Sequence, residues 1–152
     1  MAYSGKYTIK NPAKYNGDPK NIRYDSLWER QICVDLDNSN EVLSWSREPF
    51  AIPYYSPVDH QIHKYFVDFW VKKKNSKNKE QEIFLIEVKP FAQCVEPKPK
   101  TTKRGKPTKQ FISEAITWSI NSSKWKALAN FCEEKGWKFV ILNEKNYNFP
   151  KG

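Results

Sequence analysis

Two strand-like segments, residues 65–72 and 82–89, constrain the fold of this 152-residue chain more than any other feature. The first is apolar on both alternating faces, apart from Asp68 and the final lysine. The second is apolar over 83–86 and becomes charged only at its end. Strands that are apolar on both faces lie inside a sheet that is covered on both sides. The charged stretch 72–80 between them predicts a hairpin, so we expect both strands in the centre of one sheet.

Four further elements complete the predicted fold. A Ser-x-x-Glu capping signature starts a helix over 26–36, and Gly136 ends a helix over 108–135 that is hinged near 121–123. Two prolines make 42–55 an edge strand or a bent strand, and 137–142 is the last strand. The order α-β-β-β-α-β predicts an α/β fold, with a mixed central sheet flanked by helices.

The chain divides into a polar N-terminal segment and one domain. Residues 1–23 carry turn signals and no helical or strand period, which predicts a basic extended arm. Residues 24–152 have the size of a single domain, about 100–200 residues. Residues 90–109 contain four of the ten prolines and six basic residues, so we expect a long mobile basic loop there.

Composition restricts where such a protein works. Three widely spaced cysteines without a C-x-x-C pair argue against a disulfide framework or a zinc ribbon, and favour a reducing compartment. The N-terminus has no apolar leader, and the longest fully apolar run, 83–86, is far too short to cross a membrane. We therefore expect no membrane partner and no export through a signal peptide.

The net charge of +9 is unevenly distributed. Residues 90–109 carry six basic side chains and one acidic side chain, whereas residues 24–63 carry seven acidic and two basic ones. A basic segment of this kind indicates a polyanionic partner, above all nucleic acid, although basic segments can also serve only solubility.

Asp68 and the sequence Glu87-Val88-Lys89 indicate a chemical site. An ionised Asp68 between apolar neighbours is costly without a cation or hydrogen-bond donors. If the two central strands pair, Asp68 and Glu87 converge at one end of the sheet, with the Lys89 ammonium beside them. Converging carboxylates repel each other unless a divalent cation lies between them, and hard oxygen ligands suit Mg²⁺ or Mn²⁺. The alternative is an ordinary Glu87–Lys89 ion pair and a structural Asp68.

Asp68 followed by Glu87-Val88-Lys89 resembles the motif of the PD-(D/E)XK nucleases, with Val67 in place of the usual proline. The predicted element order resembles their restriction-endonuclease-like core. Over residues 15–144 the chain is also similar to the head completion nucleases of T-even-type tailed bacteriophages. The segments that carry this similarity include 24–30, 45–46, 52–54, 56–59, 63–69, 86–90 and 121–125.

The resemblance implies roles for individual residues. Asp68 and Glu87 would be metal ligands, the Val88 backbone carbonyl a further ligand, and Lys89 the catalytic lysine. Glu29 matches a first-helix glutamate that completes the metal site in many members. The same Glu29 also fits a capping box with Ser26, so both interpretations stay open. The implied cofactor is Mg²⁺, for which Mn²⁺ can substitute, and no small-molecule cofactor is implied.

The resemblance also implies a function. The protein would be a metal-dependent DNA endonuclease that hydrolyses phosphodiester bonds in free-ended or branched DNA, after DNA packaging and before the tail joins the head. DNA and the head or portal proteins would be its partners, in the virion and in the cytoplasm of the infected host. One alternative is a non-catalytic head or neck protein that binds DNA ends or the portal. Another is a recombination or repair resolvase with the same chemistry.

The basic loop begins directly after Lys89, so we expect it to bind DNA without sequence preference, unless it is only solvated. The candidate DNA contacts are Lys98, Lys100, Lys103, Arg104, Lys106, Lys109, Gln93 and Gln110.

Other polar and aromatic residues suggest weaker functions. His60 and His63 lie at a turn without further metal ligands and are predicted to be solvated. Trp70 is assigned to packing, as is Trp125. Tyr54 and its neighbour Tyr55 stay open as residues that stack on bases.

Overall fold

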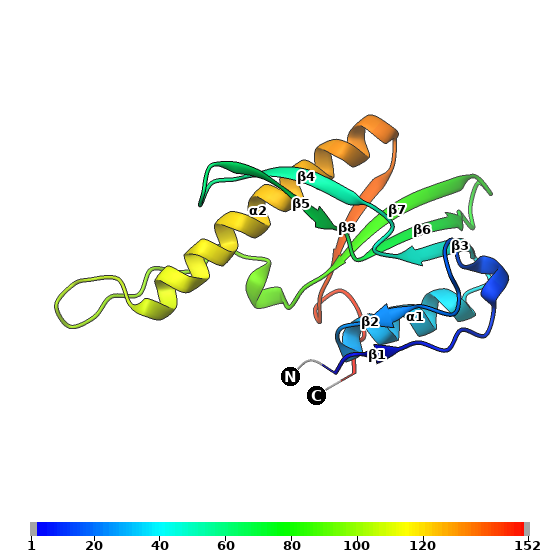
Figure 1. Cartoon of the computed structure of the whole chain (residues 1–152), viewed down its shortest axis with the longest axis horizontal. Coiled ribbons are helices and arrows are strands. Elements are labelled where there is room, and N and C mark those ends of the chain that lie inside the picture. The colour runs from blue at the N-terminus through cyan, green and yellow to red at the C-terminus, as the bar shows by residue number, and fades with distance from the viewer. Residues whose placement is uncertain (1–2, 151–152) are drawn as a thin grey trace.

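The computed structural model describes residues 3–150, which form a mixed α/β structure (Figure 1). In chain order its elements are β1 (Gly5–Lys6), the 3-10 helix η1 (Pro12–Lys14), β2 (Arg23–Tyr24), α1 (Leu27–Asn38), β3 (Val42–Arg47), β4 (Ala51–Ser56), β5 (Gln61–Phe66), β6 (Phe69–Lys74), β7 (Gln81–Val88), the 3-10 helix η2 (Phe91–Gln93), α2 (Lys109–Lys135) and β8 (Lys138–Leu142).

The central sheet has the strand order β3-β6-β7-β8. The first three strands pair antiparallel, and β8 pairs parallel to β7 after the crossover through α2. Together with α1 and α2, these strands follow the predicted order α-β-β-β-α-β, and the hairpin β4–β5 is inserted between β3 and β6. The sheet is therefore mixed, as expected, with β6 and β7 in its centre.

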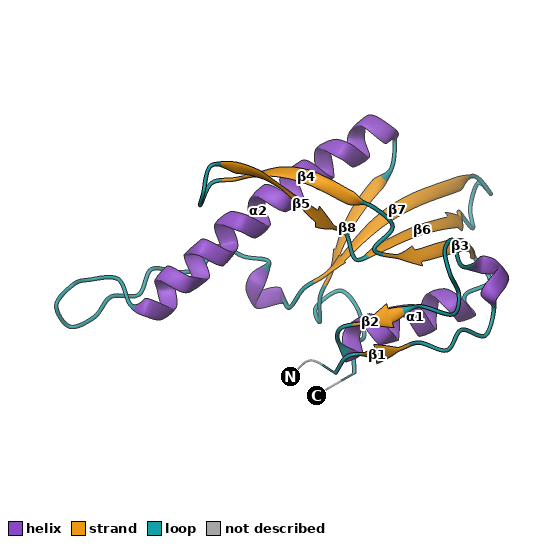
Figure 2. Ribbon diagram, in the orientation of Figure 1, coloured by secondary structure: helices purple, strands orange, loops and turns teal. Residues whose placement is uncertain are grey.

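Two hydrophobic cores lie on opposite faces of the central sheet (Figure 2). One core joins α1 and the N-terminal segment to the sheet, through residues such as Ile32, Trp45 and Phe69. The other joins α2 and the β4–β5 hairpin to the sheet, through residues such as Leu128 and Leu85. Helices thus cover both faces, because β6 and β7 offer apolar side chains on both sides.

The predicted strand 42–55 is wrong, because the chain forms two strands that belong to different sheets. β3 is an edge strand of the central sheet, whereas β4 pairs with β5 in a separate hairpin. Between them Glu48 has φ 44° and Pro49 follows, so the backbone changes direction there. The strand β5 was not predicted.

The predicted strand 65–72 is also broken, at Asp68. The carbonyl of Asp68 accepts hydrogen bonds from the side chain of Arg47 and from the N–H of Glu48, while its own N–H donates to the side chain of Glu87. The backbone of Asp68 therefore belongs to neither β5 nor β6. The break puts Tyr65 into the second core and Phe69 into the first, rather than on one common face.

Helix α2 is continuous, so the predicted hinge near 121–123 is wrong. The hydroxyls of Ser122 and Ser123 donate to carbonyls one turn earlier and leave the helical hydrogen bonds intact. The predicted C-cap is confirmed, because Gly136 has φ 72° and its N–H donates to the last turn.

The N-terminal segment packs on the domain and is not a separate extended arm. Tyr7 and Ile22 are buried in the first core. Asp37, fully buried at the end of α1, accepts hydrogen bonds from the Tyr7 hydroxyl at 2.6 Å and from the N–H groups of Lys10 and Asn11 at 2.8 and 2.9 Å. Asp37 therefore ties this segment to α1.

Replacing Asp37 by alanine should lower the free energy of unfolding by about 2–4 kcal/mol, because three donors lose their acceptor. Burial raises the pKa of Asp37, but the hydrogen bonds from Lys10, Tyr7 and Asn11 outweigh burial and lower it below its usual 3.8. A carboxyl group with a lowered pKa stabilises the fold above its unfolded pKa, and this stabilisation is lost as the pH falls through its folded pKa. Urea unfolding at neutral pH and below pH 3.8 measures both effects.

The exposed Glu41→Ala is the control for this prediction, with an expected change within about 0.5 kcal/mol. Equal stability of Asp37→Ala and Glu41→Ala at neutral pH would contradict the anchoring role of Asp37.

Within residues 3–150, no helix is long and apolar enough to cross a membrane. Cys33, Cys94 and Cys132 are free thiols, in agreement with the predicted absence of a disulfide framework.

Candidate active site

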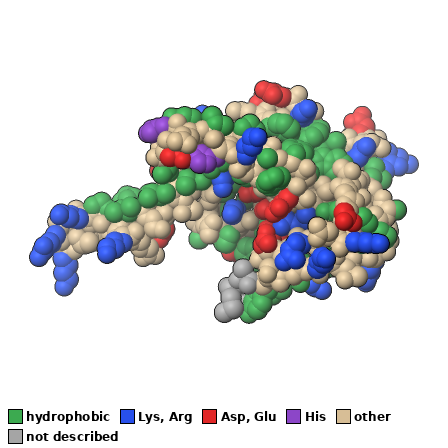
Figure 3. Space-filling model, viewed as in Figure 1, with side chains coloured by type: hydrophobic (Ala, Val, Ile, Leu, Met, Phe, Trp, Pro, Cys, Tyr) green, Lys and Arg blue, Asp and Glu red, His purple; other side chains and the backbone are tan. Residues whose placement is uncertain are grey.

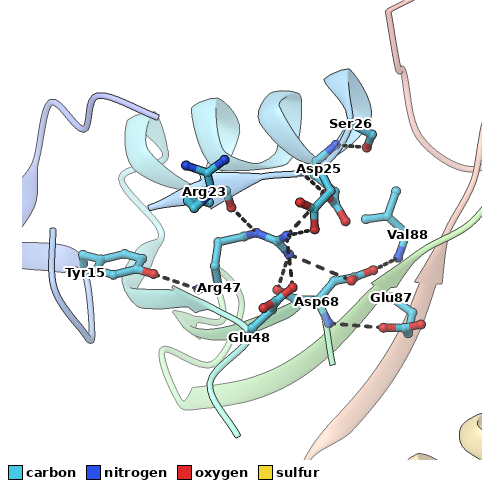
Figure 4. A network of polar contacts seen from close by, with 10 residues as sticks. Tyr15, Arg23, Asp25, Ser26, Arg47, Glu48, Asp68, Glu87 and Val88 are labelled. Carbon is cyan, nitrogen blue, oxygen red and sulfur yellow. Dashed lines mark hydrogen bonds and ion pairs between the residues drawn. The ribbon is translucent and has the colours of Figure 1, made fainter. Parts of the chain in front are cut away.

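Asp68 and Glu87 meet where β6 begins and β7 ends. Phe69 pairs with Ile86 in the antiparallel register, which brings Asp68 next to Glu87. The Asp68 N–H donates to Glu87 Oε1 at 3.2 Å, and the Val88 N–H donates to Asp68 Oδ2 at 2.8 Å (Figure 4). The two carboxylates therefore converge at one end of the sheet, as expected from the pairing of the two central strands.

Both carboxyl groups are largely buried, which disfavours their charged forms. The side chain of Asp68 is 18% exposed and Glu87 is 4% exposed. Burial and the negative charge of Glu87 raise the pKa of Asp68 well above its usual 3.8. Burial also raises the pKa of Glu87, although the Lys89 ammonium opposes this rise. At neutral pH the ionised pair is a source of instability that a bound cation would relieve.

The donor set fits a small, hard divalent cation. Carboxylate oxygens are the ligands that Mg²⁺ prefers, and Mg²⁺ keeps several positions for water or phosphate. Within residues 3–150, no three His, Cys, Asp or Glu side chains are grouped closely enough to hold a metal ion. Asp68 and Glu87 would thus supply two ligands, and further positions would be left for other oxygen atoms.

Lys89 follows β7 directly and is held at the sheet. Its backbone N–H donates to the carbonyl of Leu142 in β8 at 3.0 Å. Lys89 follows Glu87 by two residues, so the two side chains lie on the same side of the extended chain, and the positive charge of Lys89 lowers the pKa of Glu87. The structure therefore brings Asp68, Glu87 and Lys89 together.

Glu29 lies in the first turn of α1 and takes part in two interactions. The Glu29 N–H donates to the N-cap hydroxyl of Ser26 at 3.2 Å, and Glu29 Oε1 accepts from the N–H of Asp25 at 2.7 Å. The same carboxylate oxygen lies 3.3 Å from Nη2 of Arg47. Ser26 therefore caps the helix as predicted, but the Glu29 side chain bonds the N–H of Asp25 and not that of Ser26, so only half of the capping box forms. The metal-ligand role of Glu29 stays a prediction.

Arg47 is a central site residue that the sequence reasoning missed. Its side chain is only 4% exposed and reaches the carbonyl of Asp68, to which Nη1 donates at 2.6 Å (Figure 4). One signal was available, because Arg47 is one of only two basic residues in the acidic stretch 24–63. Nothing in the sequence shows that this arginine points to Asp68.

Lys124 of α2 was also not assigned a role. Its Nζ lies over the rings of Tyr54 and Tyr65, at 5.6 and 5.3 Å from their centres. Burial and the charge of Lys89 lower the pKa of Lys124, whereas Glu87 and Asp68 raise it. The Lys124 ammonium therefore lies against the β4–β5 hairpin, and the charges of Glu87 and Asp68 act on its pKa.

The aromatic and histidine predictions are partly confirmed. Trp125 is buried, and Trp70 packs against the second core, as predicted. His60 is exposed at the turn after β4, as predicted, whereas His63 is half-buried within β5, where its Nε2 lies 2.6 Å from Asp59 and its ring stacks on that of Tyr54. Tyr54 is buried in the hairpin, whereas Tyr55 is 53% exposed and still open as a stacking residue.

A long projection extends from the site side of the molecule (Figure 1). We define the projection as residues 90–120, which comprise the basic loop and the first part of α2. None of these residues is buried, and all of them are described. The predicted DNA contacts Gln93, Lys98, Lys100, Lys103, Arg104, Lys106, Lys109 and Gln110 are all exposed. Basic side chains gather at its tip (Figure 3).

Comparison with known proteins identifies the class. Residues 39–144 match the family described as TnsA-like endonuclease N terminal, a span that includes β3 to β8, Asp68, Glu87 and Lys89. The chain therefore belongs to this family of endonucleases.

The similarity to one relative covers almost the whole chain. The Head completion nuclease of Enterobacteria phage T4 is 39% identical over 144 residues, which are 95% of this chain and 93% of that protein. The resemblance to head completion nucleases that the sequence indicated is confirmed.

Proposed function

We propose that the protein is a metal-dependent DNA endonuclease with a PD-(D/E)XK core that acts in phage head completion. One observation carries this proposal: Asp68 and Glu87 form a buried, mutually repelling pair, and Lys89 lies beside it. The order α-β-β-β-α-β supports the core, and the name of the T4 relative supports the role in head completion. Its substrate would be free-ended or branched DNA, after packaging and before the tail joins.

Asp68 and Glu87 would hold the metal ion, and the Val88 carbonyl is a further candidate ligand. Glu29 would join them only after its side chain leaves the Asp25 N–H, because within residues 3–150 no three such side chains are grouped closely enough. When bound, Mg²⁺ or Mn²⁺ activates water and stabilises the charge on the reacting phosphate. Lys89 places an ammonium beside the carboxylates, where it would neutralise the phosphate or orient the attacking water. Lys124 would add a second positive charge at the same place.

The projection would hold the DNA near these residues. It starts directly at Lys89 and exposes six basic side chains, which can neutralise phosphates without reading sequence. The proposed protein partners are the phage head and portal proteins, in the virion or the infected cell. The name of the T4 relative, Head completion nuclease, supports a partner in the phage head.

The proposal is tested with a panel of duplex, nicked, flap and junction DNA. We expect cleavage of free-ended or branched DNA in Mg²⁺ or Mn²⁺ and none in EDTA, because without a metal ion nothing lowers the pKa of the attacking water or offsets the charge on the phosphate. Products are separated on denaturing gels at several times. The same preparation is tested for DNA binding by fluorescence anisotropy, so that binding and cleavage are measured separately.

Two outcomes would favour the alternatives. Binding of DNA without cleavage of any substrate, with either metal ion, would indicate a structural head or neck protein. Cleavage of junctions alone, with flap and free-ended DNA left intact, would indicate a resolvase.

A further inference from the structure

Arg47 is a buried cation at the end of β3. Its side chain is only 4% exposed, and its guanidinium lies 4.7 Å from the ring centre of Phe69, its partner in the strand register. A buried charge is costly unless it is hydrogen-bonded and paired. The guanidinium of Arg47 therefore needs hydrogen-bond acceptors and negative charges around it.

Arg47 fixes the backbone of the turn that carries Asp68. Nη1 donates to the Asp68 carbonyl at 2.6 Å, and the same carbonyl accepts from the N–H of Glu48 at 3.0 Å. On its other side, Nε of Arg47 donates to the Arg23 carbonyl at 3.0 Å. The N–H of Arg47 donates to the Tyr15 hydroxyl at 3.2 Å. The guanidinium thus links the turn of Asp68 to the segment before α1.

Arg47 also faces carboxylates from three parts of the chain. Nη2 lies 3.3 Å from Glu29, 3.7 Å from Glu48 and 3.8 Å from Asp25, and Nη1 lies 3.9 Å from Asp68 Oδ1. One guanidinium therefore contacts both Glu29 on α1 and Asp68 before β6. Figure 4 shows its contacts with Asp25, Glu48 and Asp68. A lysine has no planar fork and cannot make these contacts together with both carbonyl bonds.

We propose that Arg47 is a positioning residue of the active site, which holds Asp68 and Glu29 in place before a metal ion or DNA binds. This inference rests on the proposed nuclease function. Arg47 does not reach DNA, because its side chain is buried. Its effect is therefore on the affinity for the metal ion and on the catalytic rate, rather than on the affinity for DNA.

The test compares Arg47→Lys with the matched control Arg30→Lys, an exposed arginine on α1 next to Glu29. Mn²⁺ binding is measured by calorimetry without DNA, and kcat and KM for DNA are measured at saturating metal ion. We expect Arg47→Lys to bind Mn²⁺ about tenfold more weakly and to lose about tenfold in kcat, with an unchanged KM for DNA. Arg30→Lys should match the wild type. A purely structural role would reduce the melting temperature and leave Mn²⁺ affinity unchanged, which would overturn the proposal.

A measurement on the wild type covers the case that Arg47→Lys does not fold. The side-chain Nε–H of Arg47, bonded to the Arg23 carbonyl, should give a slowly exchanging NMR signal that shifts during a Mg²⁺ titration. A signal that does not respond to Mg²⁺ would overturn the proposal. If the wild type cuts no DNA, the nuclease function fails, while the Mn²⁺ and NMR titrations still decide the role of Arg47.

Discussion

Replacing Asp68 by asparagine should lower the rate of DNA cleavage in Mg²⁺ by about 10³-fold or more, because one of two proposed metal ligands loses its charge. The same substitution should raise the melting temperature, because it removes the repulsion between Asp68 and Glu87. Sites that are strained for function commonly gain about 0.5–2 kcal/mol when they are relaxed. Initial cleavage rates and thermal unfolding measure the two effects on the same preparations.

The pH dependence of this stabilisation has a definite sign. The folded pKa of Asp68 is raised, so the protonated group stabilises the fold fully below its unfolded pKa of 3.8, and this contribution is lost as the pH rises through the raised pKa. The increase in melting temperature of Asp68→Asn over the wild type should therefore be small near pH 4 and largest at neutral pH. Mg²⁺ should reduce this advantage, because it stabilises only the wild type.

The exposed Asp18→Asn is the control and should leave cleavage and melting temperature unchanged. Undiminished cleavage by Asp68→Asn would rule out Asp68 as a metal ligand. A lower melting temperature at neutral pH would show that Asp68 stabilises the fold rather than straining it.

Removing three charges at the tip of the projection should weaken DNA binding by about 10²-fold at low salt. Each basic side chain that neutralises a phosphate releases counterions from the DNA, and this gain is lost with the side chain. The variant replaces Lys103, Arg104 and Lys106, all exposed, by glutamine. The slope of log Kd against log salt concentration should fall by about 0.9 for each lost contact. Fluorescence anisotropy with duplex DNA at several salt concentrations measures both quantities.

The hairpin between β6 and β7 offers a matched control. Lys74, Lys77 and Lys79 are exposed there, and their replacement by glutamine removes the same number of charges. If both triple variants lose affinity equally, the effect belongs to net charge, and the projection has no special part in binding.

The sequence was sufficient for the centre of the sheet and for its carboxylate pair. β6 and β7 have apolar side chains on both faces, and this pattern can be read from the order of their own residues without knowledge of the rest of the fold. Asp68 and Glu87 could be placed together because a short hairpin determines which positions lie side by side. Their approach therefore followed from local connectivity alone.

Arg47 could not be placed in the same way. Its partners Asp25, Glu29 and Asp68 come from segments that meet only in the folded chain. Lys124 was missed for the same reason, since the whole projection separates it from Glu87 along the chain.

The hairpin β4–β5 was missed for a different reason. Pro53 within β4 weakened the strand signal, but β4 belongs to a two-stranded hairpin, where a proline is tolerated at an edge. The break at Asp68 depends on side-chain acceptors and donors that replace the ladder, which no strand pattern reveals.

The chain from residue 89 to residue 120 buries no side chain, although it joins the strand that carries Glu87 to the helix that carries Lys124. Exposed connections accept insertions, deletions and substitutions, and the entropy of closing a longer loop grows slowly with its length. The sequence of the projection, which we expect to bind DNA, is thus free to diverge among related phages. Their nucleases could come to act on different DNA structures while the carboxylates and the sheet stay the same.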